Sequence, residues 1–289
     1  MPPPANLDIS PSMSHKHFYQ SLSPLQRDHL REVLDSAFSP VPNGALRFWM
    51  GPVPMGWLNA NHVDALLKAL PGVYVDTGRV CWDGHLLSAT QRSQALALAA
   101  HALHADGLIT GWRNECYSYW GCIASEPDPD VPEWFRVERA AYRFFGLRSH
   151  AVHVNGFTSD GRMWCARRSL TKATDPGRLD NLAAGGLSAG ERVLQCAVRE
   201  LYEEAGLSAD LAQQVQSAGR ITTARMEPQG WHEETLVVYN LHIPEGVRPR
   251  NIDGEVSEFV CLTPNEVIER IQQKDFSNDA ACVIAKALC

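Results

Sequence analysis

The stretch GGLSAGERVLQCAVRELYEEAGL, residues 185–207, decides the fold of this chain. It opens in a glycine-rich loop and ends at Gly206, a residue type that commonly closes a helix. Between these points apolar residues recur at i, i+3, i+4 and i+7, namely Leu194, Ala197, Val198 and Leu201. This periodicity predicts a helix that packs one apolar face on a sheet.

Three glutamates, Glu200, Glu203 and Glu204, fall at i, i+3 and i+4 on a different face of the same predicted helix. Like charges at this spacing repel by roughly a few tenths of a kcal/mol, so the cluster is unfavourable until a cation binds it. Carboxylate oxygens suit Mg²⁺ or Mn²⁺, and Mg²⁺ commonly joins carboxylates to substrate phosphates. The spacing therefore predicts metal-dependent phosphate chemistry. Arg199 is placed to bond Glu203 or to reach back to Glu191.

The complete spacing resembles the Nudix box with every specified position filled. Gly185 is followed by five residues, Glu191, seven more residues and then RELYEEAGL, residues 199–207. The resemblance implies an α/β/α sandwich with a mixed sheet and hydrolysis of a diphosphate bond in a small molecule. It also implies metal ligation by Glu200, Glu203, Glu204 and the Gly185 carbonyl. Arg199 and Glu191 would hold loop and helix together, and Gly206 would be structural.

Catalysis by such a site needs a base for the attacking water, and the metal would lower the pKa of that water. Glu204 and Glu203 are candidates within the box. Glu255, in the run Asp253-Gly254-Glu255, is a candidate base or further ligand from outside it, and its alternative role is that of an ordinary turn carboxylate. The candidates for binding phosphate oxygens are three cations upstream of the box, Arg167, Arg168 and Lys172. Asn155 is a candidate for a hydrogen bond to the ligand.

The flanking segments resemble one branch of the Nudix family, in which an extra domain precedes the Nudix domain, as in the Nudix part associated with fungal thiamine pyrophosphokinase. The matching segments are GWRNECY (111–117), FFGL (144–147), HVNGF (153–157), PGRLDNLAAGG (176–186) and DGEV (253–256). The resemblance implies hydrolysis of thiamine diphosphate, or of a damaged analogue, to the monophosphate. Asn240 departs from the aspartate expected there, which leaves the role of that position open.

The pattern along the chain predicts three regions. Residues 1–20 form a flexible arm, residues 21–140 a smaller α+β domain with an acidic, proline-rich linker at SEPDPDVPE (125–133), and residues 141–289 the Nudix domain. A helix is predicted over 134–146, followed by a hairpin that turns at Ser159-Asp160-Gly161. The N-terminal domain is expected to shape the substrate site or to form an oligomer contact, such as that of a homodimer.

Composition restricts the remaining alternatives. Twenty-six basic against 33 acidic residues leave a net charge of −7, which disfavours RNA decapping and nucleic-acid binding in general. No apolar run approaches the roughly 20 residues of a membrane span, and the N-terminus lacks a secretory pattern. Eight scattered cysteines without a CxxC pair agree with a reducing compartment, so the cytoplasm is predicted. Two other functions stay open: an ADP-ribose or nucleotide-sugar pyrophosphatase, and a non-catalytic Nudix-fold ligand sensor.

Overall fold

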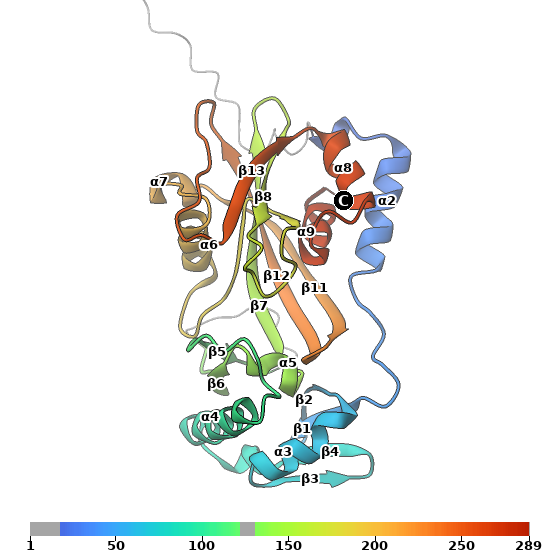
Figure 1. The fold of residues 1–289 in the computed structure, drawn as a ribbon, viewed down its shortest axis with the longest axis vertical. Coiled ribbons are helices and arrows are strands. Elements are labelled where there is room, and N and C mark those ends of the chain that lie inside the picture. Colours follow the sequence, from blue (N-terminus) through green and yellow to red (C-terminus); the bar gives the residue numbers. More distant parts are fainter. Residues whose placement is uncertain (1–17, 122–130, 289) are drawn as a thin grey trace, which may run out of the picture.

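The computed structural model describes residues 18–121 and 131–288, which form two parts stacked along the long axis of the molecule (Figure 1). The N-terminal part contains a four-stranded sheet of order β2-β1-β4-β3 and a separate antiparallel pair, β5-β6. Its strands are β1 (Leu46–Met50), β2 (Val53–Leu58), β3 (Val73–Asp76), β4 (Arg79–Trp82), β5 (Cys116–Tyr119) and β6 (Phe135–Glu138). Its helices are α3 (Val63–Ala69), α4 (Ala89–Ala105) and α5 (Ala141–Phe145), with short 3₁₀ turns at Ala60–His62 and Asp83–Leu86. The predicted α+β domain is confirmed.

The C-terminal part is built on a sheet of order β11-β12-β7-β8-β13, with β10 paired to β7 and β9 to β8. β12 runs parallel to β7 and the other pairs are antiparallel, so the sheet is mixed. The strands are β7 (Arg148–Thr158), β8 (Met163–Arg168), β9 (Leu179–Asp180), β10 (Ala183–Gly186), β11 (Gln216–Glu227), β12 (Gly230–Ile243) and β13 (Val256–Leu262). The helices are α6 (Val193–Glu203), α7 (Ala209–Ala212), α8 (Pro264–Gln272) and α9 (Asn278–Leu288).

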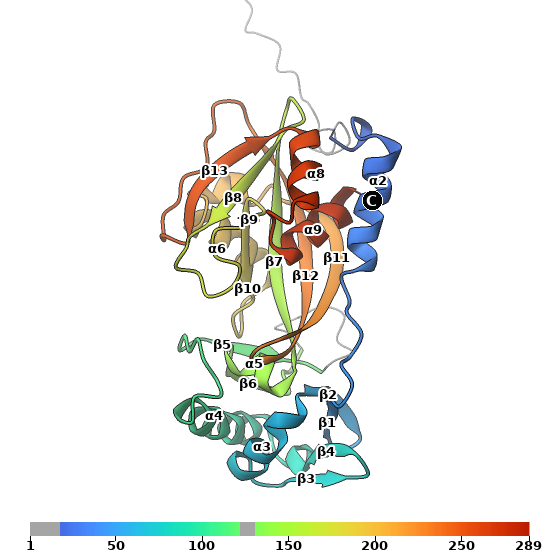
Figure 2. The same cartoon turned by 45° about the vertical axis from the view of Figure 1, so that its right-hand side comes forward.

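Helices cover both faces of this sheet (Figure 2). Alternate residues of β7 point to opposite faces. Val152 and Val154 pack with α6, whereas Phe157 packs with α8 and α9. The predicted α/β/α sandwich with a mixed sheet is therefore confirmed, as is the hairpin between β7 and β8.

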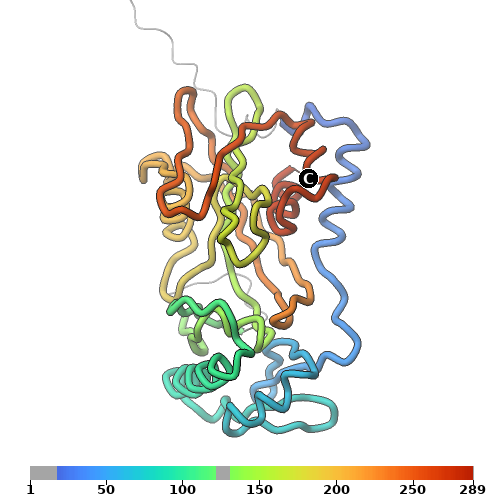
Figure 3. Tube along the Cα trace, viewed as in Figure 1, coloured from blue at the N-terminus to red at the C-terminus, as the bar shows by residue number. Residues whose placement is uncertain are grey.

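Helix α2 (Pro24–Asp35) begins at Ser23, whose side chain and Gln26 form a reciprocal cap, as the Ser-Pro pair predicts. Its partner differs from the prediction. The boundary at residue 21 assigned this helix to the N-terminal domain, but it packs on α9, and Phe18, Leu22 and Leu30 join the core beneath α8 and α9. The trace in Figure 3 shows α2 and α9 side by side. Their burial against apolar side chains far along the chain is a tertiary effect, which local periodicity does not report.

The helix predicted over residues 134–146 is wrong in its first half. Phe135 and Val137 are buried and Arg136 is exposed, a two-residue alternation that places this segment in β6, and only the second half forms α5. Glu138 fixes the strand by accepting hydrogen bonds from the backbone N–H groups of Arg113 and Glu115. Those bonds come from residues more than 20 positions away, so the local pattern does not contain them.

Within the N-terminal part, β2 is joined through backbone atoms to the end of α5, from which the chain enters β7 of the C-terminal part. The Trp57 N–H donates to the Gly146 carbonyl at 3.3 Å, and a Cβ built on Gly56 would lie 2.0 Å from that oxygen. Gly146 itself has φ +64° and ends α5. The exact domain boundaries stay predictions, and most of the predicted arm and linker, residues 1–17 and 125–130, lies outside the described residues. In the described ranges no helix is long and apolar enough to cross a membrane.

Candidate active site

Helix α6 carries the glutamate cluster and packs its buried face on β7 and β10. The buried residues are Cys196, Ala197, Glu200 and Leu201, whereas Leu194 is 46% exposed. The apolar face predicted from residue 194 is therefore rotated by part of a turn. Glu200 and Glu204 are both buried, so two of the three carboxylates of the cluster face the sheet.

Arg199 connects the glycine loop to the helix. Its guanidinium donates to both oxygens of Glu191 at 2.8 and 2.9 Å, to Glu200 Oε1 at 2.5 Å and to Glu203 Oε2 at 3.1 Å. It also donates to the Gly186 carbonyl at 3.3 Å. Both contacts proposed for Arg199 from the sequence, to Glu203 and to Glu191, are thus formed together.

Glu204, Lys172 and Glu255 lie beside this network and interact through their charges. Glu204 accepts the Ala184 N–H at 2.9 Å, and its other oxygen lies 3.5 Å from Lys172 Nζ. Lys172 is also hydrogen-bonded to Glu255. Segments far apart in the sequence, the loop after β8 and the loop before β13, therefore meet at the end of α6.

Gly185 lies against the glutamate cluster. A Cβ built on it would lie 1.8 Å from Glu200 Oε1, closer than any side-chain carbon can approach. Only glycine allows the loop backbone and the Glu200 carboxylate to come together here. Carbonyl and carboxylate oxygens are the donors that hard divalent cations prefer.

Burial makes this cluster unfavourable in its ionised form. It raises the pKa of Glu200, although Arg199 acts in the opposite direction. Burial also raises the pKa of Glu204 to about 8, partly offset by Lys172 and reinforced by Glu200. Glu255 behaves differently, because the hydrogen bond and charge of Lys172 outweigh its burial and lower its pKa.

A cavity of about 520 Å³ opens beside this cluster, between the two parts of the molecule. The C-terminal part contributes Arg168, Lys172, Gly185, Glu200 and Glu255 to its lining, among others. The N-terminal part supplies another wall, which includes Arg113, Glu115, Tyr117 and Arg139. The site is therefore composite.

Some residues predicted for substrate binding lie elsewhere. Arg167 does not line the cavity and is paired with Glu258 and Asp275. Asn155 is fully buried, where it donates to Asn240 and accepts from Asn181. Asn240, the departure noted in the sequence, is thus a partner of Asn155.

Arg168 does line the cavity, but its guanidinium is bound by the Asp180 carboxylate at 2.6 Å and by the Thr174 carbonyl. Lys172, the other predicted phosphate-binding cation that lines the cavity, makes fewer hydrogen bonds than Arg168 within the described residues.

The N-terminal wall holds the loop that follows Gly185. Ser188 Oγ donates to Glu115 at 2.6 Å, and the Ala189 N–H donates to the Cys116 carbonyl at 2.8 Å. Glu115 is also bonded to Arg139 at 2.6 Å. Sequence reasoning did not assign these residues to the site, although GWRNECY was one of the segments that matched the family, and that match was the available signal.

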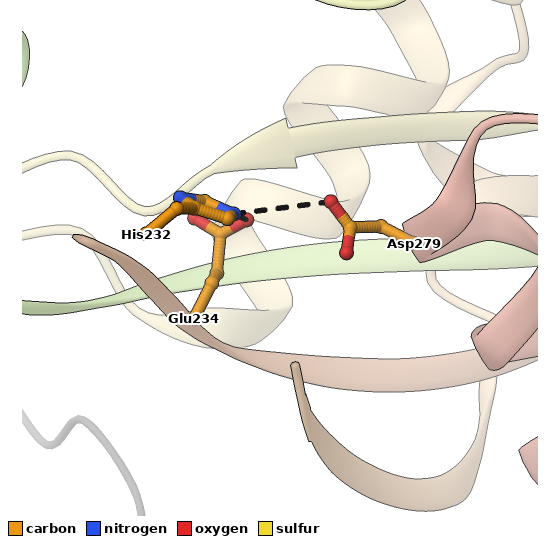
Figure 4. A group of neighbouring side chains, drawn as sticks. All are labelled: His232, Glu234 and Asp279. Carbon is orange, nitrogen blue, oxygen red and sulfur yellow. Dashed lines mark ion pairs between the residues drawn. The ribbon is translucent and has the colours of Figure 1, made fainter. Parts of the chain in front are cut away.

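A second group of titratable side chains, His232, Glu234 and Asp279, also lines the cavity (Figure 4). Their potential ligand atoms lie within 4.8 Å of one another. Alternation on β12 places His232 and Glu234 on one face of the strand, but Asp279 comes from α9. No local spacing announces this group, and the sequence analysis missed it.

The fold and the site together define an α/β/α protein with a glutamate-rich helix and a glycine loop at the edge of its sheet. Comparison with protein families matches residues 147–286 to the NUDIX domain and residues 36–149 to the domain of unknown function DUF4743. The chain therefore belongs to the Nudix hydrolases, in a group with a DUF4743 domain before the Nudix domain.

Two plant proteins are similar to this chain. Nudix hydrolase 24, chloroplastic, of Arabidopsis thaliana is 35% identical over 197 residues, which cover 67% of this chain and 52% of the relative. Nudix hydrolase 20, chloroplastic, of the same plant is 35% identical over 188 residues, which cover 64% and 49%. The chain spans about half the length of these relatives. Both names specify the chloroplast, so the cytoplasmic location stays a prediction, as does the homodimer.

Among solved structures, DR0079 from Deinococcus radiodurans matches 48% of this chain and 82% of its own chain. The TM-score is 0.40 and the sequence identity 22%.

Proposed function

We propose that the Nudix part of this protein hydrolyses a diphosphate bond in a small molecule with the help of Mg²⁺ or Mn²⁺. The observation that carries the proposal is the contact between Gly185 and Glu200 at the edge of a cavity large enough for a ligand. The ligands we propose are the Gly185 carbonyl, Glu200, Glu203 and Glu204.

The donor set fits a divalent cation. Arg199 binds one oxygen of Glu200 and one of Glu203, and the hydrogen bonds of the described residues leave the other oxygen of each carboxylate without a partner. Glu203 is 42% exposed at its side chain. The raised pKa values of Glu200 and Glu204 agree with a cluster that lacks sufficient positive charge.

The bound metal would neutralise the diphosphate and lower the pKa of the attacking water. Lys172 binds a phosphate oxygen as a point charge. Because Lys172 is bonded to Glu255, a phosphate that takes this lysine releases the Glu255 carboxylate, whose pKa then rises. We favour Glu255 as the base that accepts the water proton, because it lines the same cavity as Glu200. Glu204 and Glu203 remain the alternatives.

Thiamine diphosphate or a damaged analogue is the substrate that the family resemblance favours. The alternatives are ADP-ribose or a nucleotide sugar, which share the box chemistry and differ in the ring that the pocket holds. A ligand sensor without catalysis is a further alternative, but the complete set of box glutamates argues against it.

The experiment is incubation of the purified full chain with Mg²⁺ and a panel of thiamine diphosphate, oxidised thiamine diphosphates, ADP-ribose and nucleoside triphosphates. We expect release of phosphate or of a monophosphate from at least one compound. The matched control is Glu203→Gln, which keeps the shape of the side chain and removes its charge. Equal turnover by the variant would refute the assignment of the cluster, and no turnover by either protein would favour the sensor.

A further inference from the structure

We propose that His232, Glu234 and Asp279 bind an amino-substituted nitrogen heterocycle, with the amino group facing the two carboxylates and the ring nitrogen facing His232. This inference rests on the proposed function, since the heterocycle would be the part of the substrate that carries the diphosphate. The three side chains line the same cavity as Gly185 and Glu200. β10 and β12, which carry Gly185 and Glu234, pair with β7 on its two sides.

His232 supplies the first observation. Only 6% of the residue is exposed, and its Nε2 has no hydrogen-bond partner among the described residues. The nearest carboxylate oxygens, from Glu234 and Asp279, lie 3.8 and 3.9 Å away, too far for a hydrogen bond. Figure 4 shows the ring and both carboxylates turned toward one another. A buried polar nitrogen without a partner costs free energy, which a ligand in the cavity removes.

Tyr142 supplies a second buried group without a partner in the same cavity. Its residue is 3% exposed, and its hydroxyl makes no hydrogen bond within the described part of the chain. Two buried polar atoms without a hydrogen-bond partner, His232 Nε2 and the Tyr142 hydroxyl, thus belong to residues that line one cavity, and they indicate a polar ligand.

Charge indicates which side of the ligand faces the carboxylates. Arg143 and Arg225 both bond Glu227, and Arg225 also holds Asp279 with two hydrogen bonds of 2.8 and 3.1 Å. Glu234 accepts from Ser149 Oγ at 2.7 Å and has no lysine or arginine partner in the described ranges. Two guanidinium groups therefore serve three carboxylates, Glu227, Glu234 and Asp279. The remaining negative charge favours a hydrogen-bond donor with a positive potential, such as a conjugated amino group.

The geometry favours such a donor over a metal ion. Two ligands at about 2.1 Å from a metal lie roughly 3.0–3.4 Å apart at octahedral or tetrahedral angles. The distances from His232 Nε2 to the oxygens of Glu234 and Asp279, 3.8 and 3.9 Å, are longer than that. They fit a histidine and two carboxylates that bond two neighbouring atoms of one ligand, the ring nitrogen and the amino group.

The ring nitrogens of His232 agree with this choice. Arg143 Nε donates to Nδ1 at 3.4 Å, so the hydrogen is on Nε2. Burial also lowers the pKa of His232, which keeps the ring neutral. A neutral ring with a hydrogen on Nε2 has no lone pair there for a metal, but it donates to a ring nitrogen of a ligand.

The test uses the full chain with ¹⁵N-labelled histidine and two fragments of equal shape, 4-aminopyrimidine and 4-pyrimidinone. We expect 4-aminopyrimidine to shift the His232 signals and to bind about tenfold more tightly than 4-pyrimidinone. Glu234→Gln keeps the shape and the Ser149 contact and should abolish that preference. Glu32→Gln, at an exposed carboxylate outside the cavity, is the matched control.

The proposal would be overturned, in favour of a site that holds water only, if the two fragments bound equally well. The same conclusion would follow if neither fragment shifted the His232 signals at its highest soluble concentration. A change of the His232 Nε2 signal to that of a coordinated nitrogen on addition of Mg²⁺ or Zn²⁺ would overturn it in favour of a metal site. The fragments carry no phosphate, so their binding is independent of hydrolysis. Failure of the diphosphate panel and failure of this subsite are therefore distinguishable.

Discussion

The cavity contains two groups of carboxylates that differ in origin and in electrostatics. Glu200, Glu203 and Glu204 lie within five residues on one helix, whereas Glu234 and Asp279 are 45 positions apart on a strand and a helix. Burial raises the pKa of Glu204 to about 8. Asp279 is also largely buried, with 15% of its side chain exposed, but the charge and hydrogen bonds of Arg225 outweigh its burial and lower its pKa to about 2.

This difference shows what each group is suited to bind. The helical group lacks sufficient positive charge, so it gains from a divalent cation. In the second group Arg225 already stabilises the charge of Asp279, and His232 Nε2 and the Glu234 carboxylate, which has no lysine or arginine partner in the described ranges, are left for hydrogen bonds to a ligand. Four substitutions or conditions test the comparison, from the largest expected effect to the smallest.

The largest effect is expected from Glu200→Gln, which removes a proposed metal ligand and keeps the side-chain shape. We expect kcat for the diphosphate that is turned over to fall on the order of 10³-fold, because metal-stabilised charge in the transition state is worth several kcal/mol. Glu234→Gln should act chiefly on KM. The measurement is steady-state kinetics of both variants at saturating Mg²⁺. If both variants lose kcat alike, the two groups do not have separate roles.

Gly185→Ala tests the contact between the loop and the cluster. The added Cβ would lie 1.8 Å from Glu200 Oε1, so either the loop or the carboxylate must move. We expect the free energy of unfolding to fall by about 1–3 kcal/mol, together with most of the activity. Gly246→Ala is the control, since its Cβ meets nothing within 4 Å and only the strain of φ +87° is added, about 1 kcal/mol. Chemical denaturation measures both, and equal losses would contradict the tight contact.

The pH dependence of stability separates the two groups without kinetics. The pKa of Glu204 is about 8 in the folded protein, above its value of about 4.3 in an unfolded chain. The folded state then binds more protons than the unfolded state between these values. The free energy of unfolding of the metal-free protein should therefore fall as pH rises from about 4.5 to about 8.

We expect this loss to be about 2 kcal/mol, to shrink in Glu204→Gln and to disappear with saturating Mg²⁺. Urea denaturation at several pH values measures it. A metal-free protein whose stability does not change over this range would show that Glu204 is ionised throughout, and that Lys172 already balances its charge.

The smallest effect concerns the contact between the two domains at the catalytic loop. Ser188→Ala and Glu115→Gln each weaken the 2.6 Å hydrogen bond that joins the DUF4743 domain to the loop after Gly185. We expect each to lower kcat/KM about fivefold, which corresponds to roughly 1 kcal/mol, the net value of a typical hydrogen bond. The double variant should be no worse than either single variant, because both remove the same bond. Additive losses would mean that Glu115 acts through Arg139 instead.

The comparison also shows how far sequence reasoning reaches in this molecule. The capped start of α2, the hairpin between β7 and β8 and the helix carrying the box are all local patterns, and each is present as predicted. The first half of the helix predicted over 134–146 failed because it pairs with β5 and Glu138 is held by backbone groups of the segment just before that strand. The predicted place of α2 failed because its apolar face fits the C-terminal helices rather than its neighbours in sequence.

The same division holds for the site. Helical spacing predicted the glutamate cluster, the resemblance to the Nudix box added Gly185 and Glu191, and the structure joins Glu191 to Glu200 and Glu203 through Arg199. Sequence reasoning also predicted that Arg167 and Asn155 bind substrate. In the structure neighbouring acids and amides hold these two side chains away from the cavity. Residue type predicted what these side chains can bind, but only the surrounding charges decide what they do bind.

By itself the sequence determined the elements whose contacts lie within a few residues: the box helix, its glutamate face and the glycine loop before it. Helical and strand periodicity carry that information along the chain. Only the tertiary structure decided that Lys172 meets Glu255, that Glu115 holds the loop after Gly185 and that His232 faces Asp279. Such pairs depend on packing between segments about 50 to 80 residues apart, and no short-range pattern records them.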